Sequence, residues 1–257
     1  MSNGIKVLKR DGSVERLNID KIHIMVEHAC DGLSGVSASQ VEMNANIQFY
    51  DGIKTSEIQE ILVRSANDLI SLDNPNYQFV AARLLLFGLY KQVFGANWKV
   101  EFPTVHDHLV GGVSLQLYDG ELLGKYSMDE WDKIDTFVDH ERDFLFTYAG
   151  LRQVVDKYLV QDRSNNNIFE TPQYMYMRVA LGIWRDDLEN VQKTYDMLSQ
   201  GLFTHATPTL FNAATKRSQL ASCFLIGNKG DSIEGLFDTI KDVAQISKWA
   251  GGVGLHV

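Results

Sequence analysis

Cysteines, long apolar runs and excess positive charge are all scarce in this chain of 257 residues. Its two cysteines, Cys30 and Cys223, lie far apart, which excludes a disulfide framework and favours a reducing compartment. No run of eighteen apolar residues and no charged-then-apolar leader is present, which argues against a membrane span and a signal peptide. A net charge of −9 argues against nucleic acid as a partner. We therefore expect a cytoplasmic protein that binds neither membrane nor nucleic acid.

The composition is that of an ordinary globular protein. Hydrophobic residues make up 45% of the chain and charged residues 22%, which is enough for one large domain or two smaller ones. The negative net charge still allows a small anion to bind in a local basic pocket. The periodicity of apolar residues predicts a mainly α fold with a small β component.

The first hundred residues predict a short hairpin followed by about four helices. Asp11-Gly12 lies between two short apolar segments, and this dipeptide is typical of a two-residue hairpin turn. Ser56 and Gln59 match the capping-box pattern at the start of a helix. Apolar residues at helical spacing predict helices over 22–30, from about 39, from 56 and over 80–95, with stops near Gly32 and Gly95.

The rest of the chain predicts a second helical region, followed by a segment in which strands and a helix alternate. The best boundary is 97–104, before a mostly helical stretch that runs to about residue 205. Residues 223–226 predict a short buried strand, and 232–249 predict a helix. Residues 251–257 predict the start of another buried strand, for which we expect further chain to complete the fold.

The N-terminal hairpin concentrates positive charge. It presents Lys9 and Arg10 beside a helix start that holds Lys21. These residues supply the cations and free backbone donors that a phosphate site needs. From charge alone, a solvated basic hairpin without a ligand explains the same residues.

Residues 7–21 and 49–56 resemble the ATP-cone, a regulatory module at the N-terminus of ribonucleotide reductase large subunits. The resemblance implies that ATP or dATP binds here and sets overall activity, with lysines on the phosphates and residues 15–21 along the nucleotide. Two positions depart from the family pattern, because Gln59 stands where it has His and Ile24 where it has Arg. Inhibition by dATP is therefore left open. The residues carried over are Lys9, Arg10, Glu15, Asn18, Lys21, Thr55 and Lys91.

A second group of residues combines a Thr-Pro-Thr motif ending at Thr209 with Ser222-Cys223. Taken alone, these patterns are typical of a turn and of an inert core thiol. In this order and spacing they resemble the substrate region of the same family. The resemblance implies that Thr209, Ser222 and Gly251 bind the ribonucleotide. It also makes Cys223 half of a redox-active cysteine pair, whose second member would come from a later segment.

A third motif, Gly230-Asp231-Ser232-Ile233, is by itself a helix N-cap signature. In the family that the chain resembles, this segment belongs to the specificity site, where a nucleotide selects the substrate to be reduced. The resemblance implies that Asp231 accepts a hydrogen bond from the ribose 3′-hydroxyl. It also implies that the backbone of Ser232 and Ile233 helps to hold the nucleotide.

The resemblance spans essentially the whole chain and is also strong at 135–143 and 157–161. It is closest to the class Ia enzymes of enteric bacteria and their phages. It implies an ATP-cone over 1–96, a helical N-terminal region over 97–205, and the first strands of a ten-stranded catalytic α/β barrel over 206–257. The radical-bearing residues of the family would all lie beyond Val257, so we expect either a split-gene product or a truncated chain.

The resemblance also implies cofactors and partners. ATP and dATP would act as effectors, and this chain would hold no metal. The partners would be the C-terminal remainder of the large subunit, a second large subunit, a small subunit with a diiron-tyrosyl radical, and thioredoxin or glutaredoxin as reductant. The whole would reduce ribonucleoside diphosphates under allosteric control.

Two other functions remain to be weighed. One is a stand-alone ATP/dATP-binding regulatory module, such as a repressor that joins an ATP-cone to a zinc ribbon. Two cysteines and a negative net charge count against DNA binding of that kind. The other is an interaction protein whose ancestral site has decayed, against which the joint presence of Lys9, Lys91 and Cys223 argues.

Overall fold

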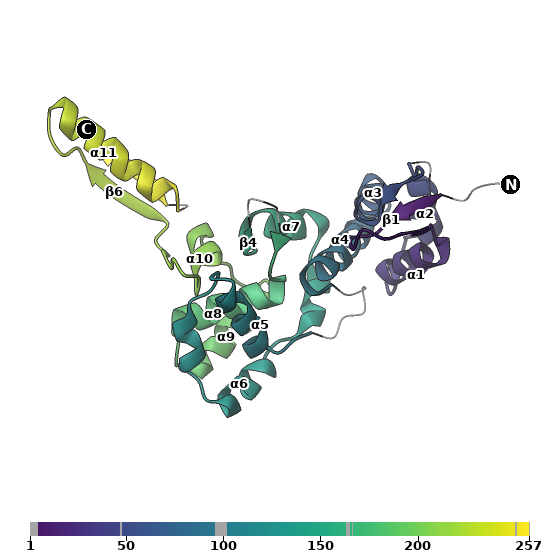
Figure 1. Cartoon of the computed structure of the whole chain (residues 1–257), viewed down its shortest axis with the longest axis horizontal. Coiled ribbons are helices and arrows are strands. Elements are labelled where there is room, and N and C mark those ends of the chain that lie inside the picture. The colour runs from purple at the N-terminus through teal and green to yellow at the C-terminus, as the bar shows by residue number, and fades with distance from the viewer. Residues whose placement is uncertain are drawn as a thin grey trace. The chain divides into compact units, whose positions relative to one another are not determined.

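The computed structural model describes residues 5–46, 48–95, 102–162, 165, 167–249 and 251–256. They form two compact units (Figure 1). The N-terminal unit contains Met1–Phe102, Glu141–Asp156 and Gln161–Thr171, and the second unit contains Pro103–His140, Lys157–Val160 and Pro172–Val257. The prediction of a mainly helical chain with few strands is confirmed. The predicted boundary at 96/97 lies outside the described residues.

The N-terminal unit carries a three-stranded sheet in the order β2-β1-β3. Strand β1 (Lys6–Leu8) pairs antiparallel with β2 (Val14–Arg16) and parallel with β3 (Ile53–Lys54). Val7 of β1 and Ile53 of β3 are almost fully buried. The hairpin is thereby fixed to the helices through the core of this unit.

The hairpin loop is longer than the sequence predicts. Lys9 N donates to Ser13 O at 2.8 Å and Gly12 N donates to Lys9 O at 3.0 Å, so three residues form the loop. Gly12 has a φ of 83°, which places it in the left-handed region that ends such loops. Asp11 Oδ1 also accepts a hydrogen bond from Ser13 N at 2.9 Å, and this side-chain bond stabilises the longer loop. The two-residue turn is therefore wrong, although the hairpin itself is confirmed.

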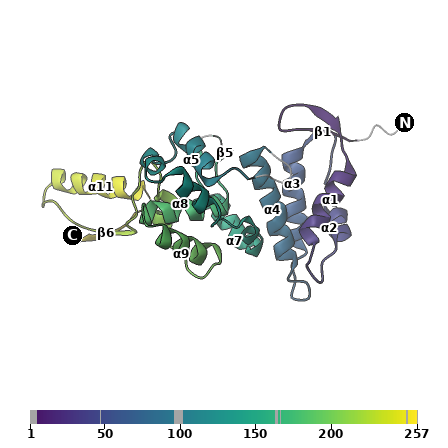
Figure 2. The ribbon, with the colours of Figure 1, turned by 90° about the horizontal axis from the view of Figure 1, so that it is seen from below.

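Four helices pack around this sheet, as expected. Helix α4 contacts both α1 and α3, and α2 contacts both α1 and α3 (Figure 2). The predicted stops are confirmed, because Gly32 and Gly95 take positive φ angles of 70° and 65° just after two of the helices. The helices are α1 (Ile19–Cys30), α2 (Ala38–Asn46), α3 (Thr55–Asp68) and α4 (Tyr77–Phe94).

The start of α3 differs from the predicted capping box. The carboxylate of Glu57, not the side chain of Gln59, accepts the hydrogen bond from the N-cap amide, Lys54 N, at 3.3 Å. Gln59 instead donates from Nε2 to Leu84 O on α4 at 2.6 Å. The Ser56–Gln59 pairing was wrong because Gln59 faces the interior, where only 7% of it is exposed.

Later segments of the chain complete the N-terminal unit. Helix α7 packs on α4, and Tyr90 of α4 donates its hydroxyl to Asp143 at 2.8 Å. Phe87 and Phe144 meet edge to face with ring centroids 6.3 Å apart. These segments are η2 (His140–Leu145), α7 (Tyr148–Gln153), η3 (Val154–Tyr158), β4 (Gln161–Asp162) and β5 (Asn167–Ile168).

The second unit is helical up to residue 212. Helix α8 lies at its centre, with Tyr174, Met175 and Arg178 almost fully buried. Helix α9 packs along α8, and α10 contacts α8 as well. The elements are α5 (Val105–Ser114), η1 (Gly120–Gly124), α6 (Met128–Asp135), α8 (Pro172–Trp184), α9 (Leu188–Ser199) and α10 (Thr207–Asn212).

The last segment forms a strand-helix-strand unit. β6 (Cys223–Gly227) pairs parallel with β7 (Gly252–His256), and α11 (Ile233–Ser247) connects them. Both predicted strands are confirmed, but their predicted burial is wrong, since Leu225 is 93% exposed and Leu255 is 48% exposed. A parallel sheet needs layers on both faces, and the described chain supplies only α11. No described helix of either unit is long and apolar enough to cross a bilayer.

Candidate functional site

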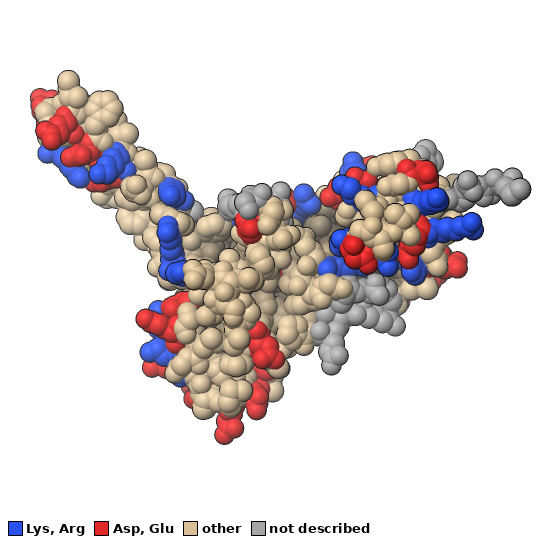
Figure 3. Space-filling view, viewed as in Figure 1, with Lys and Arg blue, Asp and Glu red and all other residues tan. Residues whose placement is uncertain are grey.

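The two lysines at the hairpin share one acid. Glu15 on β2 lies 3.6 Å from both Lys9 Nζ and Lys21 Nζ. These pairs are well exposed, so each contributes little to stability, but together they hold the lysines beside the hairpin. Asn18 caps α1, because its Oδ1 accepts from Lys21 N at 3.1 Å. Acidic and basic side chains lie next to one another on this unit, so no large basic face is visible (Figure 3).

Two further cations, Arg10 and Lys91, differ in exposure, because Lys91 is partly buried and Arg10 is exposed. Burial is the main reason why the pKa of Lys91 lies below its ordinary value, and the charges of Arg10, Lys21 and Lys9 lower it further. Burial also lowers the pKa of Arg10. No described residue forms an ion pair with Arg10 or Lys91. A partly buried cluster of like charges without a counter-ion favours the binding of an anion.

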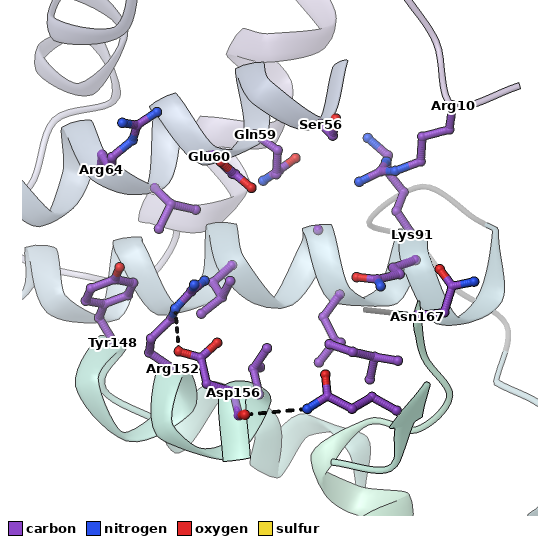
Figure 4. A pocket seen from close by; sticks show the side chains of 18 residues that line it. Arg10, Ser56, Gln59, Glu60, Arg64, Lys91, Tyr148, Arg152, Asp156 and Asn167 are labelled. Carbon is purple, nitrogen blue, oxygen red and sulfur yellow. Dashed lines mark hydrogen bonds and ion pairs between the residues drawn. The ribbon is translucent and has the colours of Figure 1, made fainter. Parts of the chain in front are cut away.

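These two cations lie at one end of a cavity of about 1080 Å³ (Figure 4). One wall comes from α3, the floor from α4, and the other wall from α7, η3 and β5. The floor is apolar around Gly88, with Leu85 and Leu89 beside it. Arg64 and Arg152 lie toward the other end. The volume is at the upper limit of small-molecule sites and accommodates a nucleotide.

The two ends of the cavity differ in charge compensation. Arg152 is paired with Asp156 at 3.0 Å, in an i,i+4 pair at the end of α7. Arg10 and Lys91 have no such partner among the described residues. Arg64, toward the other end, also has no acidic partner among the described residues, but it is exposed to solvent. The partly buried Lys91 therefore makes its own end the one that attracts an anion most strongly.

The structure brings part of the predicted effector site together and adds residues that sequence reasoning missed. Arg10 and Lys91 line the cavity, whereas Thr55 opens α3 one residue before Ser56, which does line it. Gly88 and the residues of α7 and β5 were missed. Those of α7 and β5 come from more than fifty residues later in the chain, and no local pattern links them to a nucleotide site.

The predicted substrate residues meet in the second unit, where Thr207-Pro208-Thr209 forms the first turn of α10 rather than an isolated turn. Thr209 Oγ1 donates to Leu220 O at 3.4 Å. Asn212 Nδ2 donates to Gln219 O at 2.8 Å and to Trp249 O at 3.4 Å. Asn212 therefore joins three segments that carry predicted substrate residues, and sequence reasoning missed it.

The strand pair places the remaining substrate candidates next to one another. Gly252 N donates to Ser222 O at 2.7 Å, and Cys223 pairs with Gly252 in the sheet. A Cβ on Gly251 would lie 2.6 Å from Ile246 Cγ2 and 2.9 Å from Phe224 Cε2, so only glycine fits there. Cys223 is exposed, which does not match an inert core thiol.

The other cysteine has the opposite character. Cys30, at the end of α1, packs against the core of the N-terminal unit. Burial raises its pKa to about 11, which keeps the thiol protonated at neutral pH. Cys30 is therefore unsuited to redox chemistry.

The third motif forms the start of α11. Ser232 is its N-cap, and its Oγ accepts from Gly235 N at 3.0 Å, which confirms the predicted cap. Thr239 ties the preceding loop to the helix, because its Oγ1 donates to Gly235 O and accepts from Lys229 N. Asp231 and Ile233 are exposed. In the described parts of the chain, no group of three or more His, Cys, Asp or Glu could hold a metal ion.

Fold and cavity together define a class of protein, one with an N-terminal nucleotide-binding cone. The family model described as "ATP cone domain" matches residues 5–92. Two further models match later parts of the chain, "Ribonucleotide reductase, all-alpha domain" over 144–218 and "Ribonucleotide reductase, barrel domain" over 221–257.

Whole proteins extend this likeness. The chain is 41% identical over 261 residues to ribonucleoside-diphosphate reductase 1 subunit alpha of Escherichia coli (strain K12), covering 100% of this chain and 34% of that protein. It is 40% identical over 254 residues to the subunit alpha of Helicobacter pylori (strain ATCC 700392 / 26695), covering 97% and 31%. It is 36% identical over 264 residues to the large chain of Neurospora crassa, covering 98% and 27%.

The chain therefore belongs to the family of ribonucleotide reductase large subunits. It spans about a third of the length of the relatives it matches, and it aligns with their N-terminal part. The predicted order of ATP-cone, helical region and start of the barrel is confirmed.

Proposed function

We propose that the chain takes part in reducing ribonucleoside diphosphates to deoxyribonucleoside diphosphates, as the regulatory and partly substrate-binding portion of a reductase large subunit. The family membership supports this reaction. The observation that carries the regulatory role is the cavity lined by partly buried Lys91 and exposed Arg10, neither of which has a described acidic partner. The triphosphate of ATP or dATP supplies the missing negative charge there.

In this proposal the effector phosphates contact the cations at one end of the cavity. Lys91 is held by α4, and Arg10 by the hairpin loop, so their positions are set before the ligand arrives. Lys9 and Lys21 add long-range attraction, Thr55 adds a hydroxyl, and Glu15 and Asn18 keep the hairpin and α1 in place.

In the substrate region, Thr209, Ser222 and Gly251 bind the ribonucleotide and Cys223 acts as one of two redox thiols. Two thiols lose two hydrogen atoms in total and form a disulfide. One of these hydrogens leaves with the 2′-hydroxyl as water, and the other replaces that hydroxyl on C2′. The exposure of Cys223 supports this role, because a thiol must be accessible to react. Asp231, Ser232 and Ile233 contribute to the specificity site.

The assembly we propose includes the rest of the large subunit, a second large subunit and a small subunit with a diiron-tyrosyl radical, in the cytoplasm. Thioredoxin or glutaredoxin reduces the disulfide. The relatives support partner subunits, because they are named as alpha subunits or large chains. A stand-alone regulatory module is not favoured, since all three family models match in collinear order.

Calorimetric titration of ATP and dATP into the 257-residue chain tests the regulatory role. We expect saturable binding, weakened at least about tenfold in the double variant Lys9→Ala, Lys91→Ala, which removes the phosphate contact of Lys91 and the long-range attraction of Lys9. The matched control is the double variant Lys125→Ala, Lys133→Ala, which removes two exposed lysines from the second unit. Equal affinity of the two double variants would contradict the proposal.

A further inference from the structure

A glycine stands in the middle of α4, on the floor of the effector cavity. Gly88 lies eleven residues into a helix of 18 residues, where glycine is among the least favourable residues. It has no positive φ, so no backbone strain requires glycine at this position. The reason for it must therefore lie in what a side chain at residue 88 would meet.

The nearest neighbour of that missing side chain is Gln59 on α3. A Cβ on residue 88 would lie 3.0 Å from Gln59 Cγ and 3.7 Å from Gln59 Cδ. Gln59 lies across this position because its Nε2 donates to Leu84 O, one turn earlier on α4, at 2.6 Å. Figure 4 shows Gln59 on α3 between Glu60 and Ser56, facing the cavity.

A Cβ at residue 88 would push Gln59 away from α4. The space available for that movement is limited, because Gln59 is only 7% exposed and packed protein interiors yield little. The unfilled volume next to Gln59 is the cavity itself, which Gln59 and Gly88 both line. Gln59 would therefore move into the cavity.

That movement would affect the cationic end of the cavity. Lys91 is three residues after Gly88 on α4, and Ser56 is three residues before Gln59 on α3, so each lies one helical turn from the pair. A side chain displaced from α4 would occupy space next to Lys91 and Arg10. A bulky anion would then reach those cations less easily.

We propose that Gly88 and Gln59 form a positioning pair that keeps the effector cavity open for a nucleoside triphosphate. Gly88 provides the room, and the hydrogen bond to Leu84 O holds Gln59 against α4. This inference rests on the proposed function, because the ligand it concerns is the ATP or dATP of the cone.

A double-mutant cycle tests the pair, with ATP binding to the full chain measured by calorimetry. We expect Gly88→Ala to weaken ATP binding a few-fold, because Gln59, displaced by a few tenths of an ångström, takes up space that the nucleotide needs. In a Gln59→Ala background the same change should leave ATP affinity unaltered, because no side chain remains to be displaced. Thermal unfolding of Gly88→Ala should occur at the same or a higher temperature, since alanine favours the helix.

The control is Gly111→Ala in α5, a helical glycine with nothing within 4 Å of its added Cβ. It should leave ATP binding unchanged. Equal loss of affinity on Gly88→Ala with and without Gln59 would overturn the proposal, as would no loss at all. Loss of affinity together with a lower unfolding temperature in Gly88→Ala would also overturn it, because it would indicate general damage to α4.

A second measurement separates this proposal from the proposed function. The side-chain amide signal of Gln59 in the NMR spectrum, assigned by its absence in Gln59→Ala, should shift in Gly88→Ala without any nucleotide. If the unsubstituted chain fails to bind ATP while this signal shifts, the proposed function fails and the displacement of Gln59 stands. If ATP binds and the signal does not shift in Gly88→Ala, the pair fails and the proposed function stands.

Discussion

The effector cavity and the substrate segment are built in opposite ways. In the N-terminal unit, Arg10 and the partly buried Lys91 line a cavity whose walls come from three separate stretches of chain. In the second unit, Cys223 and its neighbours lie on an exposed two-stranded sheet, although Asn212 joins the segments around them. The cavity proposed for the effector is thus enclosed by residues of this chain alone. The substrate candidates lie next to one another, but no cavity of that kind encloses them among the described residues.

The largest expected effect is on the stability of the second unit, through a buried arginine of α8. Arg178 is 1% exposed and donates to Leu210 O at 3.0 Å and Ala213 O at 2.6 Å, which fixes α10. Arg178→Met should lower the free energy of unfolding of the second unit by about 3 kcal/mol or more, because it leaves buried carbonyls unpaired. Denaturant unfolding measures this, with Lys193→Met, which removes an exposed cation of α9, as control.

ATP binding should survive in Arg178→Met, because the effector cavity lies in the other unit. If Arg178→Met abolished ATP binding at a temperature where the N-terminal unit remains folded, the contrast between the two regions would be lost.

A somewhat smaller effect on stability is expected when the pH is lowered. Burial lowers the pKa of His140 in the second unit from 6.5 to about 4. Between these values the unfolded chain binds more protons than the folded one, so stability is lost as pH falls from about 6.5 towards 4. The loss is about 3 kcal/mol at most. Thermal unfolding of His140→Gln should show a flatter profile in this window, whereas exposed His256→Gln should keep the original profile.

The two regions should also differ in the reactivity of their cysteines. With a pKa of about 11, Cys30 is a thiolate in only about one molecule in a thousand at pH 8. Cys223 is exposed and should react with a thiol reagent on the order of a hundred times faster. Mass spectrometry of time points will assign the label, with Cys223→Ser as control. Faster labelling of Cys30 would contradict the assignment of the reactive thiol to β6.

The smallest effect concerns Lys91. Its lowered pKa means that the unfolded chain holds this proton to a higher pH than the folded chain does. The nucleotide-free protein should therefore gain stability as pH rises towards the ordinary lysine pKa, while ATP affinity falls a few-fold. Both trends should be absent in Lys91→Met and weaker at high salt. Rising ATP affinity over the same range would contradict a role for this lysine in phosphate binding.

Local signals explain most of what could be predicted. The hairpin, the stops at Gly32 and Gly95 and the cap at Ser232 depend on neighbouring residues and are all confirmed. Arg10 and Lys91, which the family motifs assign to one site, line the same cavity. Failures arose where a distant partner decides, as for Gln59, whose hydrogen-bond partner lies 25 residues away.

By itself, the sequence determined the helical character of the chain, the order of its segments and the family to which it belongs. These follow from periodicity, capping and motif spacing, which act over a few residues at a time. Only the tertiary structure decided that α7 and β5 complete the effector cavity, that Gly88 lies under Gln59, and that Asn212 joins the substrate segments. Such contacts join residues far apart in the chain, and packing, not local propensity, selects them.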